Sequence, residues 1–235
     1  MELLHNVLSD LFPSRCILCQ RTADQNIEIC PECYKALPHN ERHCTCCALP
    51  LADDTDNTVL CGRCIQKKPD YDYAHSLFRY EDSVIGLVHQ LKFSEKISFA
   101  RSIGEMLLLK FLETGEEPDC LLPVPLHDSR LRQRGFNQSI EISRVLTKKT
   151  AIPIEFDVVV RHRSTPAQTG LDASQRKRNI KGAFSIEQPL NYGHVLIVDD
   201  VMTTGATVNE LARVLKKSGV ERVGVLSIAR APMKT

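Results

Sequence analysis

Residues 195–207 read Val-Leu-Ile-Val-Asp-Asp-Val-Met-Thr-Thr-Gly-Ala-Thr, and no other segment says more about the fold. The first four residues are apolar and mostly β-branched, which predicts a buried strand. Asp199 and Asp200 follow directly at the carboxyl end of that strand. A loop rich in Thr and Gly then leads into a helix predicted over residues 208–217, which Gly219 is placed to end. The segment therefore has the order strand, acidic pair, loop and helix.

The alternation of strands and helices extends over the second part of the chain. Apolar runs predict further buried strands at residues 120–126, 154–160 and 223–228. Helical spacing of apolar residues predicts helices within residues 3–11, 84–91, 103–111 and 140–147. Because such alternation is typical of a parallel sheet covered on both faces, we predict an α/β domain over residues 71–235. Ligands of these sheets bind at the carboxyl ends of the strands.

The loop after the acidic pair has the chemistry of an anion site. Backbone N–H groups at a helix N-terminus attract phosphate, and the hydroxyls of Thr203, Thr204 and Thr207 add donors. Gly205, followed by the small Ala206, allows the close backbone approach that a phosphate requires. The carboxylates of Asp199 and Asp200 can accept hydrogen bonds from ribose hydroxyls and help hold Mg²⁺. Together these groups predict a site for a 5-phosphorylated ribose. The alternative is a flavodoxin-like strand followed by a capped helix.

Nine of the ten cysteines precede residue 65 and mark a separate module, predicted over residues 1–70. They form two sets of paired CxxC turns, namely Cys16, Cys19, Cys30 and Cys33, then Cys44, Cys47, Cys61 and Cys64. Each set supplies the four thiolates of a closed structural zinc site, so we predict two Zn²⁺ ions. Crossed pairing between the sets remains open, as does a disulfide scaffold. Cys46 and His43 are spare donors, and Cys120 is predicted to be a buried, inert thiol.

Charge divides the chain at the same boundary. Residues 1–70 carry ten acids and seven Lys or Arg, a net charge of −3, whereas residues 71–235 carry a net charge of +4. Basic residues concentrate at Arg130, Arg132 and Arg134 and again over residues 161–181. This density suits a polyanion, either a small phosphorylated ligand or a nucleic acid. A solvated loop surface is the alternative.

Composition excludes several classes of protein. The chain has 235 residues, 43% hydrophobic and 25% charged, which is typical of a globular protein rather than a fibrous or disordered one. No apolar run approaches the roughly 18 residues of a membrane span, so no membrane insertion is predicted. The first residues lack the basic and apolar regions of a secretory signal, which predicts a cytoplasmic location.

Residues 195–207 closely resemble the phosphoribosyl diphosphate (PRPP) binding motif of type I phosphoribosyltransferases. Further elements resemble the competence protein F (ComF) family, whose members carry a cysteine-rich zinc ribbon before a phosphoribosyltransferase domain. These elements are Leu-Pro-Val-Pro-Leu-His at 122–127, Arg-Gly-Phe-Asn-Gln at 134–138, Leu-Lys-Phe at 91–93, Arg163, Thr165, Gln168, Arg176, Asn179 and the Ala183-Phe184 pair. The resemblance covers nearly the whole chain and implies a type I phosphoribosyltransferase fold that binds PRPP with Mg²⁺.

The resemblance also implies roles for the basic residues. Arg130, Arg132 and Arg134 would face the diphosphate, or alternatively the phosphates of DNA, because guanidinium groups suit bidentate phosphate contacts. Residues 161–181 match in position a loop that closes over PRPP, with Gln168, Arg176 and Lys181 as lid residues. Asn137 is either a helix N-cap or a ligand contact.

The function that the family implies is the uptake or handling of single-stranded DNA in natural transformation, with a competence helicase as a possible partner. The acidic module favours protein docking over direct DNA contact. No residue convinces as a catalytic base, so whether the chain is an enzyme stays open. The alternatives are a salvage phosphoribosyltransferase that acts on a free nucleobase and a non-catalytic PRPP sensor or DNA-binding adaptor.

Overall fold

The computed structural model describes residues 14–23, 27–52, 59–93, 97–163 and 178–233. The helix predicted within residues 3–11 lies outside them. In chain order the elements are α2 (Pro31–Ala36), α3 (Gly62–Gln66), β1 (Tyr73–Arg79), α4 (Asp82–Phe93), α5 (Ile97–Thr114), β2 (Cys120–Pro123), α6 (Asp128–Arg134), α7 (Gln138–Thr150), β3 (Val159–Arg161), β4 (Phe184–Ile186), β5 (His194–Met202), α9 (Ala206–Lys217) and β6 (Arg222–Arg230).

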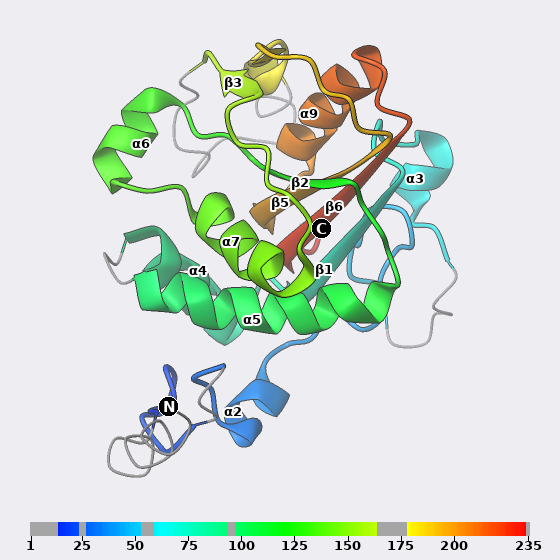
Figure 1. Ribbon diagram of the computed structural model, residues 1–235. Coiled ribbons are helices and arrows are strands. Elements are labelled where there is room, and N and C mark those ends of the chain that lie inside the picture. Colours follow the sequence, from blue (N-terminus) through cyan, green and yellow to red (C-terminus); the bar gives the residue numbers. More distant parts are fainter. Residues whose placement is uncertain (1–13, 24–26, 53–58, 94–96, 164–177, 234–235) are drawn as a thin grey trace.

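The centre of the molecule is a four-stranded parallel sheet with the strand order β1-β6-β5-β2 (Figure 1). The predicted strands at 195–198 and 223–228 are confirmed within β5 and β6, and that at 120–126 is confirmed as β2 but ends at Pro123. The predicted helices are confirmed as α4, α5, α7 and α9. β1 was not predicted from the sequence, although this strand pairs with β6 along its length. The parallel α/β domain expected from the alternation of elements is therefore present.

Side chains from alternate positions of the strands build two cores, one on each face of the sheet. Leu121, Leu196 and Val198 pack toward α4, α5 and α7. Their neighbours Cys120, Val195 and Ile197 pack toward α9 and the β3–β4 pair. This burial on both faces explains why the strands are apolar throughout rather than alternating. Cys120 is fully buried as predicted, and burial raises the pKa of its thiol to about 12.

The strand predicted over residues 154–160 is wrong in its extent. Only Val159–Arg161 forms a strand, β3, and it pairs antiparallel with β4 outside the main sheet. Ile154 makes one isolated parallel bridge to Leu121. The chain then leaves the sheet, because Phe156 is 52% exposed and a bend follows at Asp157. The apolar residues of this stretch alternate with Glu155 and Asp157 before three valines, a pattern that also fits a strand and so does not reveal the departure.

The two cysteine sets join the two different cores of the molecule. The set of Cys16, Cys19, Cys30 and Cys33, here the first cysteine site, joins the core with α4 and α5. The set of Cys44, Cys47, Cys61 and Cys64, here the second cysteine site, joins the core with α9. None of the helices in the described part of the chain has both the length and the apolar character that crossing a bilayer requires.

Candidate functional site

The acidic pair lies at the carboxyl end of β5, as predicted. β5 continues through Asp199 and Asp200 to Met202, so both carboxyl groups are held on a strand rather than on a loop. Asp199 Oδ1 accepts a hydrogen bond from the Asp200 N–H at 2.9 Å, and Asp200 Oδ1 accepts one from the Val201 N–H at 2.6 Å. These short-range bonds fix both carboxyl groups relative to the backbone.

The Thr/Gly loop turns directly from β5 into α9. Gly205 is the N-cap of α9 with φ 76°, a left-handed conformation that side chains rarely adopt. The Ala206 N–H donates to Thr204 Oγ1 at 3.3 Å, and no side chain of Gly205 can cap the helix. Thr203 through Thr207 are all partly exposed. The first turn of α9 thus presents backbone donors and hydroxyls at an accessible helix N-terminus.

Lys92, from the end of α4, completes the acidic pair with a positive charge. Its Nζ lies 3.0 Å from Asp200 Oδ2. Burial raises the pKa of Asp199 to about 7, and the neighbouring Asp200 carboxylate adds to this rise, while Lys92 opposes it. Two adjacent carboxylates that repel each other and already attract one cation are suited to a second, divalent one.

One of the three predicted arginines, Arg134, lies within electrostatic range of this acidic pair. Burial lowers the pKa of Arg134, while attraction to Asp200 opposes the shift and repulsion from Arg130 adds to it. Arg134 and Arg130, both on α6, therefore lie within electrostatic range of each other and Arg134 within range of Asp200. Arg132, on the same helix, is exposed, and the structure does not bring it to the carboxylates.

Lys92 and Arg161 are site residues that the sequence analysis missed. Arg161, on β3, is 6% exposed; burial lowers the pKa of its guanidinium, and Arg130 and Asp199 act on it with opposite signs. It therefore lies within electrostatic range of Asp199, although β3 is outside the main sheet. The predicted basic stretch 161–181 included Arg161 but placed it in a lid. For Lys92 the Leu-Lys-Phe element was the only available signal.

The lid residues divide between described and undescribed parts of the chain. Gln168 and Arg176 lie outside the described residues. Lys181 is exposed, and its carbonyl accepts a hydrogen bond from Arg163 Nη1 at 3.4 Å. The structure places Lys181 near Glu210 of α9 rather than beside the acidic pair. Its lid role stays a prediction.

Asn137 is the N-cap of α7. Its Oδ1 accepts from the Ser139 N–H at 2.9 Å and its Nδ2 donates to the Val124 carbonyl at 3.0 Å. The second bond ties the start of α7 to the segment that follows β2. Of the two roles considered for Asn137, the structure therefore supports the cap.

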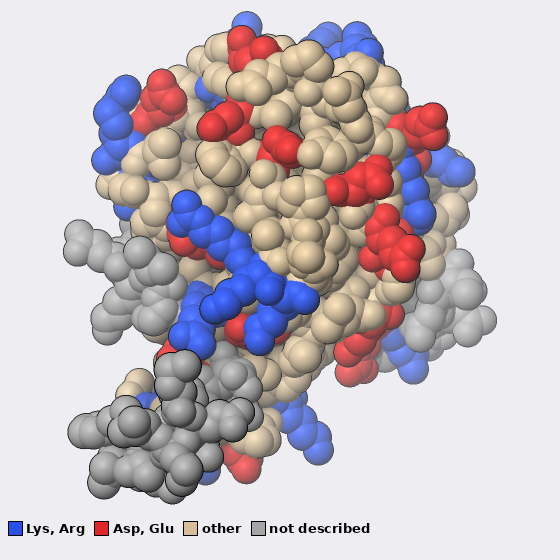
Figure 2. Space-filling model, viewed as in Figure 1, with Lys and Arg blue, Asp and Glu red and all other residues tan. Residues whose placement is uncertain are grey.

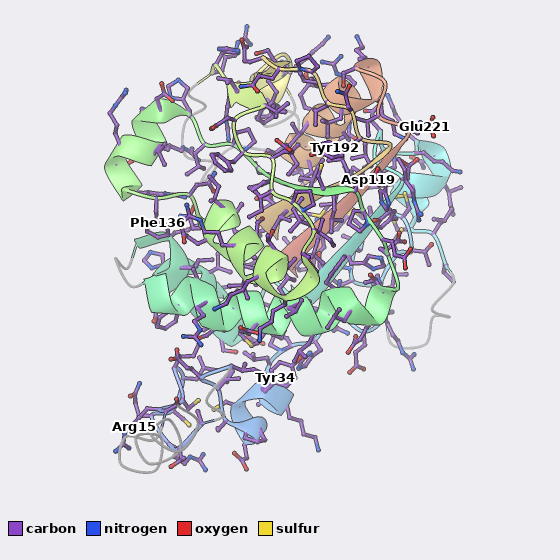
Figure 3. The ribbon with its side chains drawn as sticks, in the orientation of Figure 1. Arg15, Tyr34, Asp119, Phe136, Tyr192 and Glu221 are labelled. Atoms are coloured by element: carbon purple, nitrogen blue, oxygen red, sulfur yellow. The ribbon has the colours of Figure 1, made fainter. Side chains whose placement is uncertain are left out.

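The carboxyl ends of the strands face away from the loops that carry Asp119, Tyr192 and Glu221 (Figure 3). These three labelled residues precede β2, β5 and β6, so they mark the opposite, amino-terminal edge of the sheet. Asp119 Oδ2 accepts from the Gly193 and His194 N–H groups there, at 2.9 and 2.7 Å. The basic and acidic groups that gather around β5 thus belong to one edge only.

A separate basic surface covers α5 and α7, where Lys and Arg side chains gather in Figure 2. Exposed basic residues of these two helices include Arg101, Arg144, Lys148 and Lys149. Arg144 pairs with Glu141 at 2.6 Å. This surface lies over helices that cover one face of the sheet, and it adds a second area of positive charge to the molecule.

Both cysteine sites have the dimensions of a zinc centre. The four sulfurs of each site lie within 4.8 Å of one another. The Cys19–Cys30 and Cys47–Cys61 sulfur pairs are each 3.7 Å apart. A tetrahedron with Zn–S bonds of ~2.3 Å requires sulfurs about 3.8 Å apart, so both sets fit. The sequential pairing is confirmed, and neither Cys46 nor His43 belongs to a set.

Comparisons with known proteins agree with this architecture. The family model of the double zinc ribbon domain matches residues 7–65, and that of the phosphoribosyl transferase domain matches residues 108–235. The described parts of both matched regions hold the features derived above, namely two four-cysteine sites and a parallel sheet with the acidic pair and the Thr/Gly loop.

Full-length relatives share both regions. The DNA utilization protein YhgH of Escherichia coli K12 is 37% identical over 93% of this chain and 97% of its own length. Competence protein F of Haemophilus influenzae is 31% identical over 95% of this chain and its entire length. A hypoxanthine/guanine phosphoribosyltransferase of Methanosarcina barkeri is 37% identical over 38% of this chain and 45% of its own.

Among solved structures, the glutamine PRPP amidotransferase of Bacillus subtilis matches with a TM-score of 0.39 and 18% identity, over 59% of this chain and 30% of its own. Family membership does not depend on this structural likeness, because the phosphoribosyl transferase model alone matches more than half of the chain. The chain belongs to the competence protein F family, in which a double zinc ribbon precedes a phosphoribosyltransferase domain of type I fold.

Proposed function

We propose that the edge of the sheet around β5 binds PRPP together with Mg²⁺. The observation that carries the proposal is the continuous path from Asp199 and Asp200 to the left-handed Gly205 and the open N-terminus of α9. The loop of Thr203–Thr207 would hold the 5-phosphate, because its hydroxyls and amides converge on the helix N-terminus. The carboxylates would hold the ribose hydroxyls and Mg²⁺.

The diphosphate would lie between the carboxylates and the arginines. Arg134 of α6 and Arg161 of β3 lie within electrostatic range of the acidic pair, Arg130 lies within range of both arginines, and guanidinium forks suit diphosphate oxygens. Mg²⁺, held by Asp199 and Asp200, would neutralise charge on the diphosphate. Lys92 already neutralises part of the negative charge of Asp200, so we expect this ion pair to rearrange when Mg²⁺ binds.

Calorimetric titration with PRPP and Mg²⁺ tests the site. Asp200→Asn and Gly205→Trp should abolish the binding heat, the first by removing charge and the second by filling the loop at a strained φ. Glu221→Gln is the matched control, because it makes the same type of change at an exposed position on the opposite edge. Unchanged affinity in the Asp200 variant would remove the ribose-phosphate assignment.

We also propose that the protein handles single-stranded DNA in natural transformation, as the names of its relatives suggest. The exposed Arg132 and the basic surface over α5 and α7 supply cations outside the PRPP site. A salt series of DNA binding tests this. Removal of one phosphate-binding cation, in Arg132→Ala or Lys148→Ala, should flatten the log–log salt slope by ~0.7 on single strands. Equal slopes in wild type and variants would contradict the proposal.

A nucleobase transferase is the second candidate function. The partial similarity to a hypoxanthine/guanine phosphoribosyltransferase supports it. A diphosphate-release assay across free bases distinguishes an enzyme from a sensor, because only transfer releases diphosphate. The helicase partner, the cytoplasmic location and the domain boundary at residue 70 stay predictions.

A further inference from the structure

Arg230, the last residue of β6, lies between the second cysteine site and the Thr/Gly loop. Its side chain is 2% exposed. Nε donates to the carbonyl of Cys47, a ligand residue of the second cysteine site, at 3.0 Å. Nη1 donates to the Met202 carbonyl at 2.9 Å, to the Thr203 carbonyl and to the Ala231 carbonyl at 3.2 Å. Arg230 thus bonds to a residue 183 positions earlier in the chain as well as to the end of β5.

Burial of a guanidinium is costly unless its donors are satisfied, so this arrangement needs a compensating reason. Arg222, at the other end of the same strand, shows the ordinary solution: it is half-exposed and pairs with Glu116 at 2.9 Å. Arg230 instead donates to carbonyl oxygens of both the second cysteine site and the Thr/Gly loop. Arginine suits this geometry because its planar fork addresses several acceptors at once, which a lysine ammonium cannot do in the same way.

The carbonyls that Arg230 holds belong to the peptides that open the proposed phosphate loop. In a planar trans peptide the C=O and the following N–H point in opposite directions. Fixing the Met202 and Thr203 carbonyls toward Arg230 therefore turns the N–H groups of Thr203 and Thr204 away from it. These amides precede Gly205 and the first turn of α9, where the proposed function places the 5-phosphate.

A second contact joins the same two regions. Tyr71 is 5% exposed and shares one core cluster with the second cysteine site and Met202. A Cβ atom at Gly205 would lie 3.6 Å from Tyr71 Oη and 3.8 Å from Met202 Cε. The loop backbone therefore rests on side chains that pack against the cysteine site.

We propose that Arg230 is a positioning residue through which the second cysteine site, loaded with zinc, sets the orientation of the phosphate-binding amides. The inference rests on the proposed function for the identity of the ligand. Zinc at this site and the phosphorylated ligand at the loop then stabilise each other, and by thermodynamic reciprocity each strengthens the binding of the other by the same factor. The first cysteine site, which joins the other core, has no part in this coupling.

The variants that test the inference are Arg230→Lys, which keeps the charge without the fork, and Arg222→Met, a control that removes the exposed arginine at the other end of β6. In Arg230→Lys we expect the dissociation constant for PRPP with Mg²⁺ to rise about 5- to 150-fold, the usual range of coupling between sites. Amide hydrogen exchange in residues 203–207 should accelerate in parallel. Arg222→Met should change neither. Wild-type affinity and wild-type exchange in Arg230→Lys would overturn the inference.

Zinc affinity gives the reciprocal measurement. In a Cys33→Ser background, which leaves only the second site, a chelator competition at equilibrium should show tighter zinc binding when PRPP and Mg²⁺ are present. Arg230→Lys should remove that difference, and an unchanged difference would contradict the inference. If the wild type binds no PRPP, the proposed function fails by itself, and the exchange rates of residues 203–207 with and without zinc still decide whether Arg230 couples the two regions.

Discussion

The two cysteine sites have the same four ligands and the same spacing within each CxxC turn, yet their surroundings differ. Cys19 and Cys33 of the first site are partly exposed, whereas all four cysteines of the second are buried. The first site is attached to α5 through the bond between Glu28 and Ser102, and to β1 through the His39–Phe78 ring contact. The second is attached through Arg230 to the end of β5. The residues around a structural metal site, rather than its ligands, therefore decide whether the metal stabilises only its own segment or also supports a binding site.

The sharpest test of that contrast removes one ligand from each site. Cys61→Ser should cost more than about 5 kcal/mol of unfolding free energy, because zinc binding is folding energy for a module whose ligands lie in a shared core. Cys33→Ser should lose one zinc per chain while the sheet keeps its denaturant midpoint. Metal analysis with hydrogen exchange of β5 and β6 measures both. An equal increase of hydrogen exchange in β5 and β6 in the two variants would contradict the difference between the sites.

The attachment of the first site can be weakened without touching a ligand. Phe78 is fully buried in β1 and its ring lies 5.1 Å from that of His39. Phe78→Ala should cost roughly 3–5 kcal/mol in urea unfolding, because apolar burial is removed and a cavity is left behind. Zinc affinity at the second site should stay at its wild-type value. Leu112→Ala, at a side chain 62% exposed, is the control and should change stability little. A drop in second-site affinity would show that the faces are coupled.

The acidic pair beside the second site should make stability depend on pH. The pKa of Asp199 is raised to about 7 from an ordinary value near 3.8, by burial and then by Asp200. Between those two values the folded state holds a proton that the unfolded state has released, so unfolding free energy falls as pH rises and levels off above pH 7.

Asp199→Asn removes this penalty and should stabilise the protein by about 2 kcal/mol at pH 8, with no gain below pH 4. Thermal unfolding of both proteins from pH 4 to pH 8 measures the difference. The ion pair of Lys92 and the charge of Arg161 act in the opposite direction and remain in the variant. A gain that does not vary with pH would exclude Asp199 as its source.

The smallest expected effect is at the contact between the first site's segment and α5. Ser102 Oγ donates to Glu28 Oε2 at 2.7 Å, and Ser102 is fully buried. Ser102→Ala should cost about 1 kcal/mol, the net worth of one hydrogen bond. A double-mutant cycle with Glu28→Gln isolates the pair in urea unfolding. Additive losses would mean that the two side chains do not stabilise each other.

The sequence predicted those parts of the site that are contiguous in the chain. The acidic pair, the loop and α9 lie within residues 195–217, and the sequential cysteine pairing follows from local turns. Lys92, Arg161 and Arg230 could not be assigned, because only the packing of α4, β3 and β6 around β5 brings them to it. β1 was missed because His75 and Ser76 interrupt its apolar pattern, although Ser76 and Ser227 satisfy each other inside the sheet.

The strand order has a consequence for assembly during synthesis. β6 follows every other described strand in sequence, yet it lies between β1 and β5. The N–H of Val223 donates to the Asp72 carboxylate, 151 residues earlier. β1 therefore cannot pair with β6 until almost all of the chain has been synthesised. Such non-local pairing is slow to form. A ribosome-bound chain can therefore acquire both zinc ions well before the segment that carries Arg230 emerges, and the ligand loop gains its support in the final step of folding.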